Sequence, residues 1–263
     1  MKVFVLLGSV LVLGALFSCV VAENRAAGVV VGDWFKYGDF KAYFNSNDPY
    51  ADPILSYPST LGFLNEANET EWMLMLVENI SSPSFPFDPS HYVYTIHLST
   101  TKHLKNGTET VEAGFVSLED GWGNMAFKVV AANLDVSDDA YIVHSGKIDS
   151  TMNRTYPNGV RETNHMRMTY NMTDIRYLDS ETLNGTRDEI QDYYWDRVTG
   201  VLVEYSFYLS EEAGNWSSSW SMSYRLMESN TWIVPEHFTT LTLLVTFAFL
   251  ALLILLSKRR LKV

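Results

Sequence analysis

The chain has little cysteine and few basic side chains, and both shortages exclude certain kinds of site and partner. One cysteine, Cys19, among 263 residues allows no intramolecular disulfide and no zinc site built from several cysteines. The 19 basic side chains face 31 acidic ones, a formal net charge of −12. Phosphate binding needs a basic surface, so we expect no nucleic-acid partner. A hydrophobic share of 47% is enough for a folded core, so global disorder is not expected.

Residues 1–22 are predicted to be a secretory signal peptide. One lysine comes first, then a predominantly apolar run from Val3 to Phe17, then small residues up to Ala22. The alternatives are an uncleaved anchor and a lipoprotein cleaved before Cys19. Cleavage after Ala22 would remove Cys19 and leave a mature chain without a thiol.

Residues 238–256 are predicted to be a transmembrane helix. This run has no charge, proline or glycine, and at about 1.5 Å per residue it spans about 28 Å, close to the bilayer core. A basic cytoplasmic tail, residues 257–263, follows, and its charges are expected to keep the C-terminus inside. These charges are Lys258, Arg259, Arg260 and Lys262.

Residues 23–237, between the two apolar ends, are then predicted to be an extracellular domain. Leaving out the five basic residues of the ends leaves 14 basic against all 31 acidic side chains, a net charge of −17. Asn-X-Ser/Thr sequons are frequent in this part and absent from both ends, which indicates a surface glycoprotein. The candidate N-glycosylation sites are Asn68, Asn79, Asn106, Asn153, Asn171, Asn184 and Asn215.

The C-terminal junction resembles the PEF-CTERM sorting signals of archaeal surface proteins. The resemblance lies in Pro235, Glu236 and His237, followed by the apolar run and the basic tail; His237 stands where the signal has phenylalanine. It implies anchoring at an archaeal cell surface and processing by an archaeosortase. The whole layout, including the opening Gly32-Asp33-Trp34, resembles archaeal surface proteins of unassigned function. Many sequons without a cysteine in the mature chain fit an archaeal surface better than a eukaryotic one.

The extracellular part is predicted to be mainly β. Apolar and polar residues alternate with period two over 92–98, 201–209 and 219–226, as in half-buried antiparallel strands, and the strand predicted over 72–77 is apolar on both faces. We expect eight to ten strands in one strongly curved antiparallel sheet or half-barrel, with a two-sheet β-sandwich as the alternative. Thr199-Gly200 predicts a hairpin over 190–209, and a short helix is expected within 179–188. Four further turns are predicted, at Asn106-Gly107, Asp120-Gly121, Pro157-Asn158-Gly159 and Asn184-Gly185.

The sequence contains no recognisable catalytic motif, so we predict no enzyme, no cofactor and no metal. His91, His97 and His103 are six residues apart, too far along a strand to share one zinc ion. The acidic run Asn133–Asp139 imitates the start of a calcium loop, but it lacks the glycine and the final glutamate, and we interpret it as a turn.

The aromatic residues leave two interpretations open, a core or a ligand site. They cluster at Tyr193, Tyr194, Trp195, Tyr205, Phe207, Tyr208, Trp216 and Trp220. The sequence therefore predicts a non-catalytic binding domain on the cell membrane. Its candidate partners are a surface glycan, a lipid or another envelope protein. The alternatives are an extracellular hydrolase, a carrier-like binder of an apolar ligand, and a purely structural envelope component.

Overall fold

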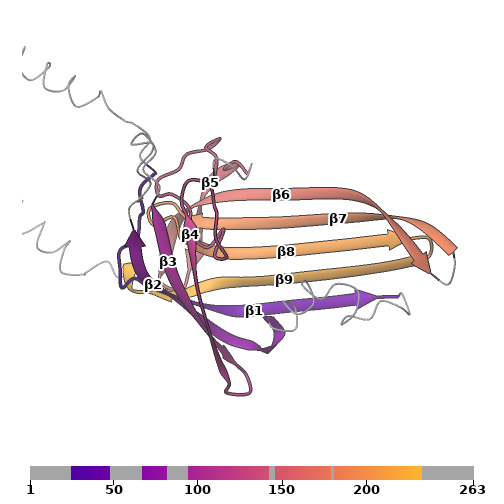
Figure 1. The fold of residues 1–263 in the computed structure, drawn as a ribbon, viewed down its shortest axis with the longest axis horizontal. Helices are drawn as coiled ribbons and strands as arrows, with labels where there is room; N and C mark the ends of the chain where they lie inside the picture. The colour runs from indigo at the N-terminus through magenta and orange to yellow at the C-terminus, as the bar shows by residue number, and fades with distance from the viewer. Residues whose placement is uncertain (1–24, 48–66, 82–93, 142–145, 179–180, 233–263) are drawn as a thin grey trace, which may run out of the picture.

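The computed structural model describes residues 25–47, 67–81, 94–141, 146–178 and 181–232. In this part of the chain nine strands form one antiparallel sheet (Figure 1). The strands are β1 (Trp34–Ser46), β2 (Thr70–Ser81), β3 (Thr95–Leu104), β4 (Glu109–Ser117), β5 (Ser150–Tyr156), β6 (Gly159–Leu178), β7 (Glu181–Asp196), β8 (Leu202–Ala213) and β9 (Trp216–Ser229). A short 3-10 helix, η1 (Asn230–Trp232), follows.

The sheet consists of two meanders that meet where the first strand pairs with the last. The strand order is β4-β3-β2-β1-β9-β8-β7-β6-β5, so β4 and β5 are its edges and the sheet is not closed. Strands β2, β3 and β4 cross the direction of β1 and β6–β9 steeply, so the sheet bends strongly (Figure 1). The prediction of one curved antiparallel sheet is confirmed, and the two-sheet sandwich is wrong for the described residues.

Period-two alternation assigns the side chains to two faces, which we call inner and outer. On β9 the inner positions Trp220, Met222, Tyr224 and Leu226 are buried, whereas the residues between them are partly exposed. The inner face is the hydrophobic core. The predicted 190–209 hairpin is formed by β7 and β8, with Gly200 at φ +70 in the turn.

Two predictions for residues 179–188 are wrong, because this segment lies in β7 from Glu181 onward. Asn184-Gly185 is not a turn but part of the strand. Gly185 is opposite Asp174 on β6 and Ala213 on β8. A Cβ at Gly185 would lie 2.8 Å from the backbone oxygen of Glu212, so the glycine permits close packing of strands here.

A β-bulge in β1 decides which residues of this strand face outward. Gly38 pairs with Arg225 and Lys41 with Ser223, so one extra residue of β1 is accommodated between them. Asp39, in this bulge, has φ +53. The extra residue shifts the alternation by one position, so Lys41 belongs to the outer face instead of the inner one.

The long connection between β4 and β5, which we call the crossover, covers part of the inner face. Its side chains Met125, Val129 and Ile148 are buried in the core. The Tyr141 hydroxyl donates to Val129 O at 2.6 Å and accepts from Phe127 N at 2.9 Å. The predicted turn at Asp120-Gly121 lies in the crossover, and those at Asn106-Gly107 and Pro157–Gly159 join neighbouring strands.

No helix among the described residues is long and apolar enough to cross a membrane. The predicted transmembrane helix 238–256 lies outside the described residues, as do the signal peptide 1–22 and the tail 257–263.

Candidate functional site

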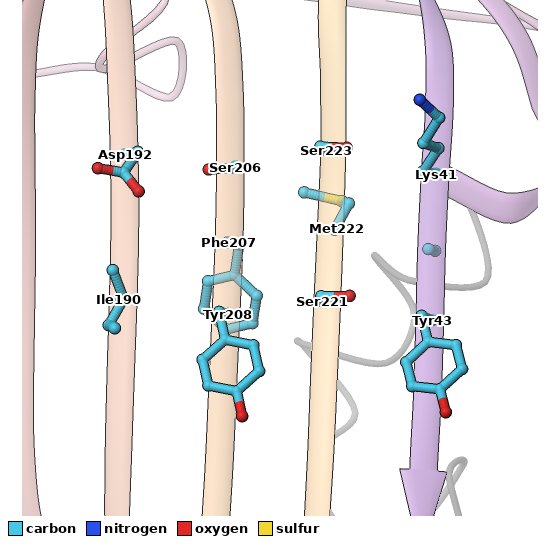
Figure 2. A pocket seen from close by; sticks show the side chains of 11 residues that line it. Lys41, Tyr43, Ile190, Asp192, Ser206, Phe207, Tyr208, Ser221, Met222 and Ser223 are labelled. Atoms are coloured by element: carbon cyan, nitrogen blue, oxygen red, sulfur yellow. The ribbon is translucent and has the colours of Figure 1, made fainter.

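A groove of about 440 Å³ runs across four strands of the outer face (Figure 2). It crosses β7, β8, β9 and β1, which are neighbours in the sheet. We call it the outer groove. Its lining is Lys41, Ala42, Tyr43, Ile190, Asp192, Ser206, Phe207, Tyr208, Ser221, Met222 and Ser223.

The first row of the outer groove carries two exposed tyrosines. Tyr208 of β8 and Tyr43 of β1 each pair with Ser221 of β9, and residues paired in this way share a face. The tyrosines are 44% and 61% exposed. At a strand spacing of about 4.8 Å, their backbones are about 10 Å apart across the small serine. Figure 2 shows both rings on the same side of the sheet.

The second row is polar and lies beside the tyrosines. Asp192 pairs with Ser206, Ser206 with Ser223, and Ser223 with Lys41. Two hydroxyl groups therefore lie between Asp192 and Lys41, whose ammonium group pairs with Asp39 at 3.1 Å. Because serine side chains are short, the two serines form the floor of the groove between Asp192 and Lys41.

Asp192 is the one carboxylate of the groove lining, and it is held in its charged form. Arg167 donates two hydrogen bonds to it, at 2.8 and 3.0 Å, and His165 Nε2 lies 2.7 Å from its Oδ1. Burial raises the pKa of Asp192, but the bonds from Arg167 and His165 outweigh burial, and the net shift is downward. An ionised carboxylate suits a hydrogen-bond acceptor for hydroxyl groups, not a general acid.

The structure divides the predicted aromatic cluster between the two faces. Tyr193, Trp195, Tyr205 and Trp220 are buried in the inner core, which confirms the core interpretation for these four. Tyr208 belongs to the outer groove. Tyr43, Asp192 and the serines were not predicted from the sequence as site residues. The alternating serines Ser219, Ser221 and Ser223 were the available signal, since they mark an outer face of small side chains.

The described sequons are accessible on the surface. The side chains of Asn68, Asn79, Asn106, Asn153, Asn171 and Asn215 are exposed, as a glycosylation acceptor must be. The side chain of Asn184 is outside the described part. Asn171 donates to Asp188 at 2.5 Å on the outer face. Modification of these residues stays a prediction.

The acidic turn of the crossover is bound to basic residues of the chain. Arg197 forms ion pairs with Asp135 and Glu162, and Lys147 pairs with Asp139 at 3.3 Å. Within the described ranges no group of three or more His, Cys, Asp or Glu side chains could hold a metal ion. His91 lies outside these ranges.

The remaining sequence motifs have different outcomes. In the opening Gly32-Asp33-Trp34, the Asp33 carboxylate accepts from Val30 N at 2.8 Å, and Gly32 N donates to Val77 O, so the motif ties the chain to β2. The sorting-motif residues Pro235, Glu236 and His237 and the basic residues Lys258, Arg259, Arg260 and Lys262 lie outside the described residues.

Two further hollows border the crossover. One, of about 690 Å³, lies beside β6, and its lining includes Gly146, next to the undescribed residues 142–145. The other, of about 320 Å³, lies on the inner face.

Comparison of the chain with protein-family models, with curated proteins and with solved structures found no match in any of the three.

Proposed function

We propose that residues 23–237 form a non-catalytic binding domain on the outside of a cell, and that its outer groove binds a surface carbohydrate. The N-terminal signal and the transmembrane helix 238–256 place the domain at the membrane, with the basic tail in the cytoplasm. The sequons make it a glycoprotein. The PEF-CTERM-like junction indicates an archaeal cell surface.

The paired tyrosines of the outer groove carry the carbohydrate proposal. The C–H groups on one side of a pyranose ring form an apolar face that packs on an aromatic ring, while its hydroxyl groups need polar partners. Tyr43 and Tyr208 supply two such rings from backbones about 10 Å apart, roughly the length of a disaccharide. Ser206 and Ser223 offer donors and acceptors beside them, and Asp192 and Lys41 complete the row.

The same arrangement favours binding over hydrolysis. A glycosidase normally uses two carboxyl groups on opposite sides of the scissile bond, one of them protonated. Asp192 is the single carboxylate of the groove lining, and the bonds from Arg167 and His165 keep it charged. The groove supplies hydrogen bonds and stacking surfaces without this acid and base pair.

Calorimetric titration of the purified full chain with cellohexaose and with the β-1,4-linked hexamer of N-acetylglucosamine tests the proposal. Extended β-1,4 chains present the same face once per disaccharide, which suits the tyrosine spacing. We expect saturable binding of at least one hexamer. Tyr43→Ala and Tyr208→Ala should each weaken it five- to tenfold, about 1–1.4 kcal/mol.

Tyr170→Ala is the matched control, because Tyr170 is 40% exposed but lies on the inner face of β6. It should bind like the unaltered chain. Absence of saturable binding for both hexamers, or equal affinities of the Tyr43→Ala and Tyr208→Ala variants and the unaltered chain, would refute the carbohydrate proposal.

A glycan on Asn171 would leave the sheet close to the outer groove. Asn171 pairs with Asp188, which is two residues from Ile190 at the end of the tyrosine row. The titrations therefore include Thr173→Ala, which removes this sequon without changing the groove lining. If the attached glycan competes for the tyrosines, this variant binds the hexamers more tightly.

A further inference from the structure

The hollow on the inner face has apolar and polar residues in its lining, and it contains a fixed ammonium group. Its volume is about 320 Å³. Met73 of β2, Met125 of the crossover and Met222 of β9 meet in its lining, together with Phe40 and Tyr224. Methionine side chains are flexible and polarisable, so they adapt to ligands of irregular shape. We call this hollow the inner cavity.

Lys128 brings a positive charge to the inner cavity without an acidic partner. Its ammonium group donates to the Tyr224 hydroxyl at 2.7 Å and lies 4.8 Å from the centre of that ring. Among the described residues no carboxylate lies within ion-pair distance of it. Lys102 of β3 and Glu112 of β4 also border the cavity, and the Glu112 side chain is exposed. A partly buried ammonium group with one neutral acceptor leaves room for an anion.

The backbone before Lys128 is strained, and buried side chains hold it in place. Phe127 has φ +63, which is uncommon for a bulky residue. Its N–H donates to the Tyr141 hydroxyl, and its carbonyl oxygen accepts from Trp195 Nε1 at 2.9 Å. Lys128 O then accepts from Leu202 N at 2.9 Å. Strain of this kind persists only where surrounding contacts fix it, and it concentrates at functional sites.

We infer that the inner cavity binds a single-chain amphiphile with a carboxylate head group, which pairs with Lys128 while its aliphatic chain lies against the methionines. A water molecule occupies about 30 Å³ in the liquid, so the cavity holds on the order of ten groups of that size, enough for a medium-length chain. The site lies on the opposite face from the outer groove and shares with it Met222 of the β9 strand. It is therefore a second ligand site, and it does not rest on the carbohydrate proposal.

The test is calorimetric titration of the full chain in zwitterionic nanodiscs with octanoate, octanol and octyl phosphate, after subtraction of empty discs. We expect saturable binding of one octanoate per chain and weaker binding of octanol. Lys128→Met should weaken octanoate about tenfold and leave octanol within about twofold, because it removes the charge and keeps an apolar chain. Lys128→Arg should restore the preference for octanoate.

Two controls separate a bound ligand from partition into lipid and from loss of fold. Lys147→Met removes a lysine that pairs with Asp139 outside the cavity lining, and it should bind octanoate normally. Near-ultraviolet circular dichroism reports whether Lys128→Met keeps its aromatic packing. If that variant unfolds, ¹³C NMR of carboxyl-labelled octanoate on the unaltered chain decides instead, because the pKa of a carboxyl group beside an ammonium group falls.

The proposal is overturned if the unaltered chain binds no octanoate above the empty discs, if Lys128→Met weakens octanoate and octanol equally, or if octyl phosphate binds and octanoate does not. Tyr43→Ala should leave octanoate binding unchanged. Failure at the inner cavity can therefore be told apart from failure at the outer groove.

Discussion

Replacing Tyr141 by phenylalanine removes one oxygen atom from the centre of the core, and its effect can be worked out from two hydrogen bonds. Tyr141 is fully buried, and its hydroxyl satisfies both Val129 O and Phe127 N. Burial raises the pKa of this hydroxyl well above its usual range, so it stays protonated and can donate at all ordinary pH values. The Tyr141→Phe variant keeps the ring and leaves two backbone groups without a partner.

Each buried group left without a partner costs about 1–3 kcal/mol, so we expect Tyr141→Phe to lower the free energy of unfolding by about 2–4 kcal/mol. Urea unfolding of the purified chain, followed by tryptophan fluorescence, measures this change. With an m-value of about 2–3 kcal/mol per molar urea, the midpoint should fall by about 1 M at an unchanged m-value. The loss should exceed that of Tyr37→Phe, where the hydroxyl serves one acceptor, Leu202 O, at 2.8 Å.

Tyr43→Phe serves as the control, because the Tyr43 side chain is 61% exposed and its hydroxyl contributes little to stability. Its free energy of unfolding should stay within about 0.5 kcal/mol of the unaltered chain. Equal midpoints for the Tyr141→Phe and Tyr43→Phe variants would refute the reasoning. The crossover would then not be fixed to the sheet through the Tyr141 hydroxyl, and this hydroxyl would not hold Lys128 in place.

Two further predictions concern pH. Burial raises the pKa of several tyrosines above their usual 10.0, so their contribution to stability is complete below pH 10 and is lost as the pH rises further. Absorbance titration of the phenolates should show these tyrosines ionising together with unfolding; ionisation at pH 10 in the folded chain would contradict it. The buried tyrosines with a raised pKa are Tyr37, Tyr141, Tyr156, Tyr193 and Tyr205. The pKa of Asp192 is instead lowered from 3.8, so its contribution is present above pH 4 and is lost as the pH falls through the folded-state pKa. Asp192→Asn should cost about 1–2 kcal/mol at pH 7, since Arg167 is half exposed, and the loss should shrink in acid; a loss independent of pH would contradict the ionic reading.

Much of the β structure could be predicted because it depends on residues that are close together in the sequence. The alternation of Trp220, Met222, Tyr224 and Leu226 with serine and arginine marks a strand with one buried face. The turn predicted at Asn184-Gly185 was wrong for the same reason. Local turn chemistry carries no information about the neighbouring strands, which need a residue without a side chain at this position. Long-range packing overrides the local signal there.

The candidate sites were harder to predict, because their residues come from distant segments. Tyr43 and Tyr208 are 165 positions apart in the sequence and meet across Ser221 because β1 pairs with the last strand. The bulge at Asp39 then places Tyr43 on the outer face. Lys128 lies in a segment without a repeating pattern, so no periodicity indicates its direction.

The sequence by itself determined several of the strands, several of the turns between them and the aromatic character of the core, because these follow from residues within one strand or one turn. The tertiary structure alone decided that β1 pairs with β9, that the crossover covers the inner face, and which aromatic residues are exposed. Those outcomes depend on contacts between segments more than 100 residues apart, such as the bond from Arg25 to Ala140 O. The two candidate binding sites depend on such contacts.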